Sequence, residues 1–234
     1  MKKFDIISIF PESLESYFKA SILKRAQDKK LIKISSYNLR DFTLDKHRKV
    51  DDKPYGGGAG MVMMAEPIIR ALKKIKAFRS GKKTRIILLA ANGKQFTQKD
   101  AKRLAGYDRL VFICGRYEGV DARVEKFINE KISIGPYVVT GGELPAAIII
   151  DAVARMVPKV VGKEESVKNE SFSNTSSESR EASSEKYLEH PHYTRPDKLI
   201  IDKKVYSVPK VLLQGNHKLI DRWRSNKSAK IREK

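Results

Sequence analysis

The residues most able to do chemistry lie in three glycine-punctuated segments, at residues 45–61, 115–121 and 133–145. The first joins a charged run, which contains His47 and Asp51, to the sequence GGGAG at residues 56–60. Glycines let a backbone approach a base or a phosphate closely, and the charged flank suits a nucleotide. The spacing fails the dinucleotide fingerprint, because Met61 and Met63 stand where a glycine is required, and no Gly-Lys-Ser/Thr completes a P-loop. A mobile hinge beside a solvated charge run is the alternative interpretation.

The other two segments follow expected strands and are rich in polar and backbone groups. In the second, Gly115 and Gly119 bracket the tripeptide Arg-Tyr-Glu directly after an apolar run that ends at Cys114. The third is apolar but contains four glycines or prolines before it enters a helix, so its backbone can present N–H and C=O groups to a flat ring. Ion pairing within the second segment and a plain turn in the third are the alternatives. Cys114 is best interpreted as a small core residue.

Metal-dependent and triad chemistry are not favoured by this sequence. The four histidines, His47, His190, His192 and His217, are scattered and lack nearby acidic ligands, so no zinc site is predicted. The single cysteine excludes an internal disulfide and a cysteine-rich metal site. No Ser-His-Asp order supports a nucleophilic hydrolase. We therefore expect no protein-held metal centre.

The elements that must position these segments alternate between strands and helices. Residues 85–91 and 109–114 are nearly continuous apolar runs, which are typical of strands buried on both faces. This alternation predicts an α/β fold with a mostly parallel sheet, whose ligands bind beyond the carboxyl ends of the strands, at residues 91–95, 115–119 and 135–142. The expected strands are residues 4–10, 31–39, 85–91, 109–114 and 131–134. The expected helices are residues 14–30 with Ser13 as N-cap, 67–78, 97–104, 120–129 and 145–157.

Charge and composition point to a polyanionic partner. The chain has 234 residues, with 48 Lys and Arg against 28 Asp and Glu, a formal net charge of +20 and a sequence pI near 9.9. Nucleic acid is favoured over an anionic membrane, because no strongly amphipathic basic helix stands out, although a solvated basic surface is the simpler alternative. The longest apolar run, residues 146–150, cannot cross a bilayer, and Pro11 cuts the first apolar stretch. We expect a cytoplasmic protein without membrane association.

Charge is distributed unevenly and divides the chain. Residues 1–163 have 33 basic and 17 acidic residues, whereas residues 164–189 have 3 and 7, with eight serines. Residues 190–234 are basic again, with 12 basic and 4 acidic residues. The acidic, serine-rich stretch has few apolar residues and is typical of a flexible linker. We predict a larger domain at residues 1–162, a linker at 163–189 and a small basic unit at 190–234.

Taken together, several segments resemble the bacterial tRNA (guanine-N1)-methyltransferases that modify guanosine 37, next to the anticodon. This family, the TrmD family, is of the SPOUT class. The stretch from Arg40 to Pro67 is highly specific in combination with the GRYEG and GGELPA loops. The matching segments run in the family's order from the first strand to near the C-terminus, and they are IISIFPES, YNLRDFTLDKHRKVDDKPYGGGAGMVMMAEP, CGRYEGVDARV, SIGPYVVTGGELPA, HPHYTRP and VLLQGNHKLIDRWR.

The resemblance implies a fold, a cofactor and an assembly. The expected fold is an α/β domain with a SPOUT trefoil knot and a mostly parallel sheet, followed by a small helical C-terminal domain that binds tRNA. The expected assembly is a homodimer with each active site at the subunit interface. The expected methyl donor is S-adenosylmethionine. The residues carried over to its binding are Leu89, Ala90, Gly115, Tyr117, Glu118, Gly119, Ser133, Ile134, Gly135, Pro136, Tyr137, Val138, Val139, Gly141, Gly142 and Pro145.

The resemblance also assigns residues to the tRNA guanine and to catalysis. Asp51 and Gly60 match positions close to the guanine, and Arg155 matches an arginine near its O6 atom. Guanine N1 carries a proton that must leave before its lone pair can attack, so a carboxylate base is needed, and an arginine or Mg²⁺ at O6 would stabilise the developing charge. The family's base is an aspartate before Ser-Phe, where this chain has Glu170.

Glu170 is the main departure from the family and leaves alternatives open. Glutamate reaches one C–C bond further than aspartate, roughly 1.5 Å, and a misplacement of about 1 Å can cost about 100-fold in rate. Glu170 is therefore a tolerated base or the mark of a slow enzyme, and Glu165 is an alternative base. The rival hypothesis is a tRNA-binding homologue with weak or lost methyl transfer. A methyltransferase for another RNA site is a third possibility.

Overall fold

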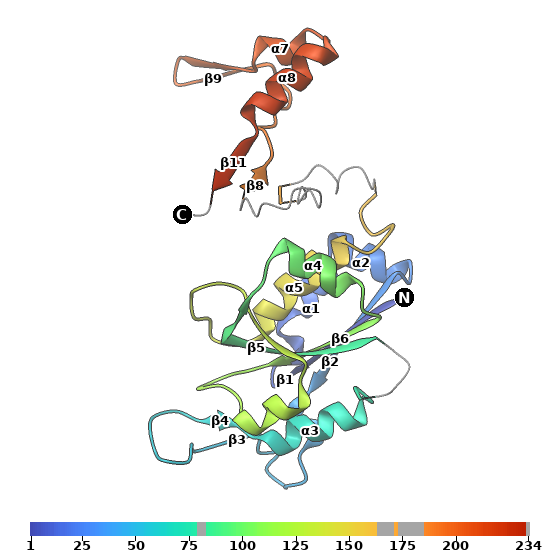
Figure 1. The fold of residues 1–234 in the computed structure, drawn as a ribbon, viewed down its shortest axis with the longest axis vertical. Coiled ribbons are helices and arrows are strands. Elements are labelled where there is room, and N and C mark those ends of the chain that lie inside the picture. Colours follow the sequence, from blue (N-terminus) through green and yellow to red (C-terminus); the bar gives the residue numbers. More distant parts are fainter. Residues whose placement is uncertain (79–82, 163–170, 173–184, 233–234) are drawn as a thin grey trace. The chain divides into compact units, whose positions relative to one another are not determined.

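The computed structural model of the protein describes residues 1–78, 83–162, 171–172 and 185–232. The chain forms two compact units, Met1–Gly162 and Lys163–Lys234. The first unit contains a central sheet with helices on both faces (Figure 1). Within the described residues, every helix is too short or too polar to span a membrane.

The central sheet of the first unit has five strands in the order β2-β1-β6-β5-β7. All four strand pairs are parallel, which confirms the predicted parallel α/β architecture. Strand β6 lies in the middle, and every residue after its first is buried. The strands are β1 (Lys2–Ser8), β2 (Ile32–Asn38), β5 (Thr84–Gln95), β6 (Arg109–Cys114) and β7 (Glu130–Ser133).

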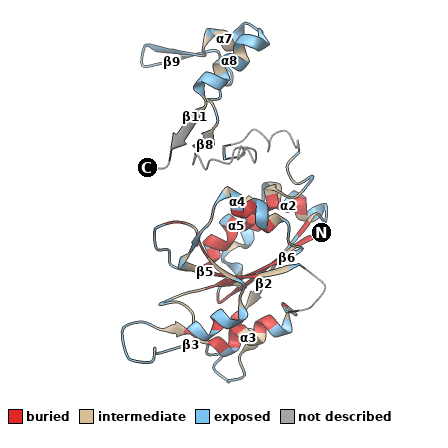
Figure 2. Cartoon of the chain, in the orientation of Figure 1, coloured by how far each residue is buried: buried red, intermediate tan, exposed pale blue. Residues whose placement is uncertain are grey.

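Each face of the sheet packs against its own set of helices and forms its own apolar core. Alternation along β6 divides its side chains, so that Phe112 joins one core and Ile113 the other. The first core includes side chains of α1 (Glu15–Phe18), α2 (Ser21–Asp28), α4 (Gln98–Ala105) and α5 (Glu143–Arg155). The second includes those of α3 (Ala65–Lys74), η2 (Leu39–Phe42) and η3 (Ala122–Phe127). Figure 2 shows buried residues on the sheet and on the sheet-facing sides of these helices.

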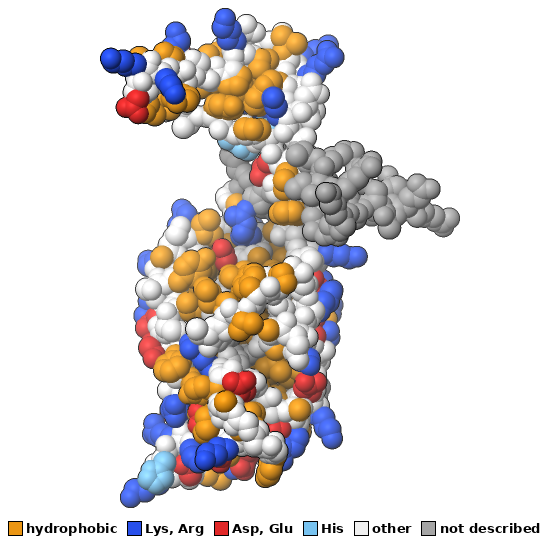
Figure 3. Space-filling view, turned by 90° about the vertical axis from the view of Figure 1, so that its left-hand side faces the viewer, with side chains coloured by type: hydrophobic (Ala, Val, Ile, Leu, Met, Phe, Trp, Pro, Cys, Tyr) orange, Lys and Arg blue, Asp and Glu red, His pale blue; other side chains and the backbone are white. Residues whose placement is uncertain are grey.

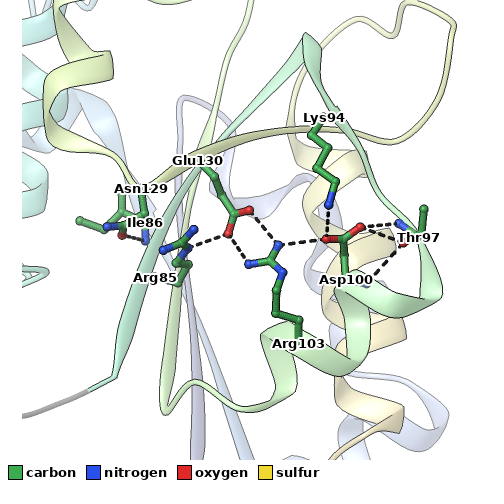
Figure 4. A network of polar contacts seen from close by, with 8 residues as sticks. All are labelled: Arg85, Ile86, Lys94, Thr97, Asp100, Arg103, Asn129 and Glu130. Atoms are coloured by element: carbon green, nitrogen blue, oxygen red, sulfur yellow. Dashed lines mark hydrogen bonds and ion pairs between the residues drawn. The ribbon is translucent and has the colours of Figure 1, made fainter. Parts of the chain in front are cut away.

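Helix α4 begins as its sequence predicts and is locked to β7 by charged groups. Thr97 and Asp100 form a reciprocal capping box at its start. Asp100 is buried and also accepts hydrogen bonds from Lys94 (3.0 Å) and Arg103 (3.1 Å). Arg103 in turn donates to Glu130 at 2.8 Å, so a chain of ion pairs ties the helix to the sheet edge (Figure 4).

The predicted helix over residues 14–30 is wrong as a single element. The chain forms a 3-10 turn, η1 (Pro11–Leu14), then α1, and then α2. Ala20 is extended, and the Phe18 carbonyl accepts a hydrogen bond from the Gln27 side chain (2.8 Å) instead of continuing a helix. Ser13 does not act as an N-cap, since its hydroxyl donates back to the Phe10 carbonyl at 2.9 Å.

Other predicted boundaries also move. Residues 120–129 contain the 3-10 helix η3 instead of an α-helix, and α5 begins at Glu143, two residues before Pro145. Residues 91–95 are not a loop, because β5 continues through a register shift and pairs with β7 again. Gly93 permits this, since a Cβ there would lie 2.6 Å from the backbone of Ile132.

The first unit also has a small antiparallel pair that the sequence analysis did not predict. Strands β3 (Asp51–Asp52) and β4 (Val62–Met63) pair with each other and flank the glycine cluster. Gly56, Gly57, Gly58 and Gly60 all have positive φ, which side chains rarely adopt. The cluster is therefore the turn between two strands.

The second unit is not purely helical in its described part. It contains two helices, α7 (Lys210–Leu213) and α8 (His217–Lys227). It also contains two antiparallel pairs, β9 (Lys198–Ile201) with β10 (Lys204–Ser207) and β8 (Glu185–Leu188) with β11 (Ala229–Arg232). Most of the predicted linker, residues 163–170 and 173–184, lies outside the described residues.

Candidate active site at the carboxyl ends of the strands

A cavity of about 420 Å³ lies where β6 and β7 end, beside the register shift of β5. Its volume falls within the range of small-molecule sites, roughly 300–1,000 Å³. Gly135 and Pro136 are the two residues expected at the cofactor that do not line it. The expected residues that do line it are Leu89, Ala90, Gly115, Tyr117, Glu118, Gly119, Ser133, Ile134, Tyr137, Val138, Val139, Gly141, Gly142 and Pro145.

The second and third glycine segments are held together by backbone contacts. The Gly142 N–H donates to the Gly115 carbonyl at 2.9 Å, and Arg116 forms an isolated antiparallel bridge with Gly141. A Cβ at Gly142 would lie 2.6 Å from Cα of Cys114, so only glycine allows α5 to start against β6. Segments that are separated by some 25 residues therefore form one wall of the cavity.

A buried ion pair fixes this wall, and sequence reasoning had left its partners open. Arg116 donates to Glu143 at 3.0 Å, and Ser8 donates to the other Glu143 oxygen at 2.5 Å. The Arg116 guanidinium also lies 4.8 Å from the ring centre of Phe10. A Cβ on Gly141 would lie 2.2 Å from Nε of Arg116. Glycine is thus required at position 141 by the ion pair.

Cys114 lies beneath the same wall and is not a nucleophile. Its side chain is fully buried. Burial raises the pKa of the thiol well above its usual range, and the nearby Glu143 carboxylate raises it further. The thiol is therefore protonated at neutral pH, in agreement with its interpretation as a core residue.

The fold also brings the two predicted guanine-contacting residues, Asp51 and Gly60, beside residues that line the cavity. Backbone hydrogen bonds join β4 and the residue before it to the second segment. The Met63 N–H donates to the Gly119 carbonyl (2.9 Å), and the Glu118 N–H donates to the Met61 carbonyl (3.0 Å). Gly60 is so close to Glu118 that a Cβ would lie 2.6 Å from its Cγ atom. Residues far apart in sequence thus meet at one edge of the cavity.

Tyr117 links the cavity to Asp51. Its backbone has a φ of +57°, which is uncommon for a residue other than glycine and marks a sharply turned loop. Partial burial raises the pKa of its phenol, and a hydrogen bond to the Asp51 carboxylate raises it further. The phenol therefore stays protonated beside the Asp51 carboxylate at neutral pH.

Sequence reasoning missed a second charged pair that lines the cavity. Lys131 donates to Glu125 at 2.9 Å, and both residues line the cavity. Glu125 lies on η3 and Lys131 on β7, so no motif spacing connects them. The alternation of β7 could have identified Lys131, because Ser133, two residues further along, was already expected at the cofactor.

The two predicted catalytic residues are not shown at this cavity. Arg155 ends α5, ten residues after Pro145, and ten residues of helix extend about 15 Å. Glu170 lies outside the described residues. Among the residues that the structure describes, no group of three or more His, Cys, Asp or Glu is placed to hold a metal ion.

Comparisons with known proteins show which family the sequence matches. The sequence model for "tRNA (Guanine-1)-methyltransferase TrmD" matches residues 1–234. The tRNA (guanine-N(1)-)-methyltransferase of Dictyoglomus turgidum is 49% identical, over 98% of this chain and 86% of the relative. The enzyme of the same name from Carboxydothermus hydrogenoformans is also 49% identical, over 97% of this chain and 82% of the relative. The motifs that carry this likeness form the walls of one cavity. Because the family's sequence model matches the whole chain, the protein belongs to the tRNA (guanine-1)-methyltransferase TrmD family.

Proposed function

We propose that this protein transfers a methyl group from S-adenosylmethionine to N1 of guanosine 37 in tRNA, in the cytoplasm. The observation that carries the proposal is the convergence at one cavity of the cofactor motifs and the guanine motif. Asp51 and Gly60 contact Tyr117 and Glu118, which line that cavity. A methyl donor and a guanine held at these two sets of residues would be neighbours, as direct methyl transfer requires.

The cavity residues fit the proposed cofactor. When bound, S-adenosylmethionine supplies an electrophilic methyl group on a positively charged sulfur. The cavity offers backbone groups of a glycine-rich wall for a flat ring, and the carboxylate of Glu118 for positive charge.

The chain's own residues have distinct roles in this proposal. Asp51, beside the Tyr117 phenol, and Gly60 would hold the guanine at the cavity edge. Glu170 would accept the N1 proton, which frees the lone pair for attack on the methyl group. Arg155 would stabilise negative charge on O6 as that proton leaves. An ion such as Mg²⁺ at O6 is an alternative to the arginine for the same task.

The position of Arg155 supports a homodimer with its active site between subunits. Arg155 lies about 15 Å of helix away from the cavity of its own subunit. A second copy could supply this arginine, with Glu170, to the cavity. Helix α5 has apolar side chains exposed one turn apart, Leu144 and Ile148, and Tyr17 is exposed on α1. Figure 3 shows exposed hydrophobic side chains gathered on one face of this unit, which suits a subunit contact.

The proposal includes a trefoil knot in the first unit. Strand β7 lies beside β5, yet Gly142 hydrogen-bonds to Gly115 after β6. Residues 134–142 must therefore cross the carboxyl end of β5 before α5 begins. A chain that crosses back over an earlier connection in this way is what a knot requires, although knots are rare among protein folds.

The rival function, a tRNA-binding homologue without turnover, has less support. Relatives named as methyltransferases match nearly the full chain, including a 44% identical one from Clostridium tetani over 99% of this chain. The cofactor cavity also keeps fourteen of sixteen expected residues. The glutamate at position 170 and the altered linker favour the rival, and Glu170 is the residue that the experiment changes.

The test is single-turnover methyl transfer to a tRNA transcript with guanosine 37. Glu170→Gln should lower the rate by at least about 100-fold, because an amide cannot accept the N1 proton. Glu165→Gln, a nearby change of the same charge, is the matched control and should keep the wild-type rate. Binding of cofactor and tRNA, measured by calorimetry, should be unchanged in both variants.

Two results would contradict the assignment. Wild-type rates from Glu170→Gln, with loss of rate in Glu165→Gln, would transfer the role of base to Glu165. Absence of methyl transfer by the wild-type protein, with intact tRNA binding, would favour the rival function. Glu170→Asp should retain activity, since it restores the family's residue at this position.

A further inference from the structure

A second cavity lies at the opposite end of the strands from the candidate active site. It has a volume of about 250 Å³, and its lining includes Lys3 near the start of β1, Thr84 at the start of β5 and Arg109 at the start of β6. Strand β6 runs from Arg109 to Cys114, so its length separates the two cavities by about 17 Å. The methyl-transfer reaction proposed above does not use this cavity.

Strand register places three cations side by side in this cavity. Lys33 on β2 pairs with Lys3 on β1, and Lys3 pairs with Arg109 on β6. Residues that are partners in register point to the same face of a sheet. Like charges directly opposite each other destabilise a sheet, so this row costs stability unless other groups neutralise it. Lys76, which follows α3, adds a fourth cation to the lining.

The carboxylate in this cavity neutralises only one of the four cations. Asp5 is buried and forms an ion pair with Arg109. The Arg109 guanidinium also donates to the carbonyls of Ile75 (2.9 Å) and Lys76 (3.1 Å) at the end of α3. The Tyr37 hydroxyl occupies the other Asp5 oxygen at 3.4 Å. Asp5 and Arg109 thus stabilise the packing of α3 against the sheet.

The three lysine ammonium groups in this cavity lack comparable interactions with the described residues. Within the described parts of the chain, the side chains of Lys3, Lys33 and Lys76 make no hydrogen bond or ion pair. They share the cavity with the hydroxyls of Ser35 and Thr84. Ammonium donors without a protein acceptor, in a hollow with a net charge of +3 from four cations and Asp5, are suited to an anion.

We infer that this cavity binds a phosphate group. Its volume lies below the usual range for whole small-molecule ligands, so it fits one phosphate better than a complete nucleotide. A bound phosphate would offset the repulsion along the Lys33–Lys3–Arg109 row. The phosphate can be a free ion or part of the backbone of a bound tRNA, and only the second source depends on the proposed function.

The first experiment uses thermal unfolding of the full-length protein with inorganic phosphate. Sodium phosphate and sodium chloride are compared at equal ionic strength, and the test variant is Lys3→Gln/Lys33→Gln. Lys29→Gln/Lys99→Gln removes two exposed lysines outside the cavity and is the charge-matched control. Phosphate should raise the midpoint of the wild type and the control, because a ligand of the native state stabilises it, and the shift should disappear in the test variant.

The second experiment measures tRNA binding as a function of salt for the same three proteins. If the phosphate belongs to tRNA, the test variant should lose roughly 0.7–0.9 from the salt slope, which is the contribution of one phosphate contact. The control should lose clearly less. A phosphate shift lost without a change of slope identifies free phosphate as the ligand. If the test variant equals the control in both experiments, the inference is wrong.

A tRNA that fails to bind the wild-type protein at all would contradict the proposed function. The unfolding experiment would still decide the phosphate site in that case. In chloride, the test variant should be at least as stable as the control, because it removes two of the three opposed cations.

Discussion

The two units of this protein differ in how they obtain stability. The first has two apolar cores, one on each face of a five-stranded sheet, with Phe4, Leu110 and Ile113 among its fully buried side chains. In the second, none of the side chains described between Leu188 and Ser228 is buried. Burial of a large aliphatic side chain contributes about 1.5–3 kcal/mol, so the described residues of the first unit, unlike those of the second, supply the apolar core on which an independent domain depends.

The difference suggests a division of labour. The cofactor cavity belongs entirely to the first unit, where fixed loops can hold a small ligand. The second unit combines a charge of +8 over residues 190–234 with exposed apolar and aromatic groups, such as Ile200 and Tyr193. Basic and aromatic groups without a core are suited to contact with a nucleic acid, which can then order them.

Removal of the second unit should give the largest effect. A chain of residues 1–162 should fold, unfold at nearly the wild-type midpoint, and bind S-adenosylmethionine with unchanged affinity. Its tRNA affinity should fall steeply, and if four phosphate contacts are lost the salt slope should drop by about three. Calorimetry with cofactor and salt titration with tRNA check the two halves of this expectation. Unchanged tRNA binding by the short chain would remove the second unit from the RNA interface.

Matched truncations in the two units should give the next largest effect. Ile113→Ala opens a cavity in a fully buried site and should cost about 2–5 kcal/mol of unfolding free energy. Ile200→Ala removes the same atoms from a side chain that is 74% exposed, and should change stability by less than about 0.5 kcal/mol. Urea denaturation of the full chain measures both. Similar losses from the two variants would show that the second unit has a core of its own.

The same contrast explains what the sequence could predict. Runs such as residues 109–114 are apolar at every position, so burial alone identifies them as strands of a parallel sheet. The glycine-rich loops were identified because backbone approach limits the residue types that fit, as at Gly142. Local chemistry of this kind can be recognised in a single sequence, and it identified the loops that form most of the cavity wall.

Features that depend on tertiary contact were not predictable in the same way. The break at Ala20 depends on a hydrogen bond from Gln27, and the extension of β5 depends on a second pairing with β7. The pairs Arg116–Glu143 and Lys131–Glu125 join elements that no periodicity connects. The β3–β4 pair is two residues long, too short for an alternating pattern.

The smallest expected effect concerns pH and the ion pairs that lock α4 to the sheet in the first unit. Burial alone would raise the pKa of Glu130, but hydrogen bonds from Arg103 and Arg85 outweigh it and lower the pKa below the ordinary value of 4.5. A carboxyl with a lowered folded-state pKa adds stability that is present above its unfolded pKa and is lost as pH falls through the folded one. Glu130→Gln should therefore cost about 1–3 kcal/mol at neutral pH. That deficit should shrink below about pH 4.5, because the wild type loses the same interaction there.

Glu66→Gln, at an exposed ion pair on α3, is the control and should cost less than about 1 kcal/mol at any pH. Urea unfolding across this pH range measures the difference, and parallel pH profiles for wild type and Glu130→Gln would show that the network does not stabilise the fold through its charge.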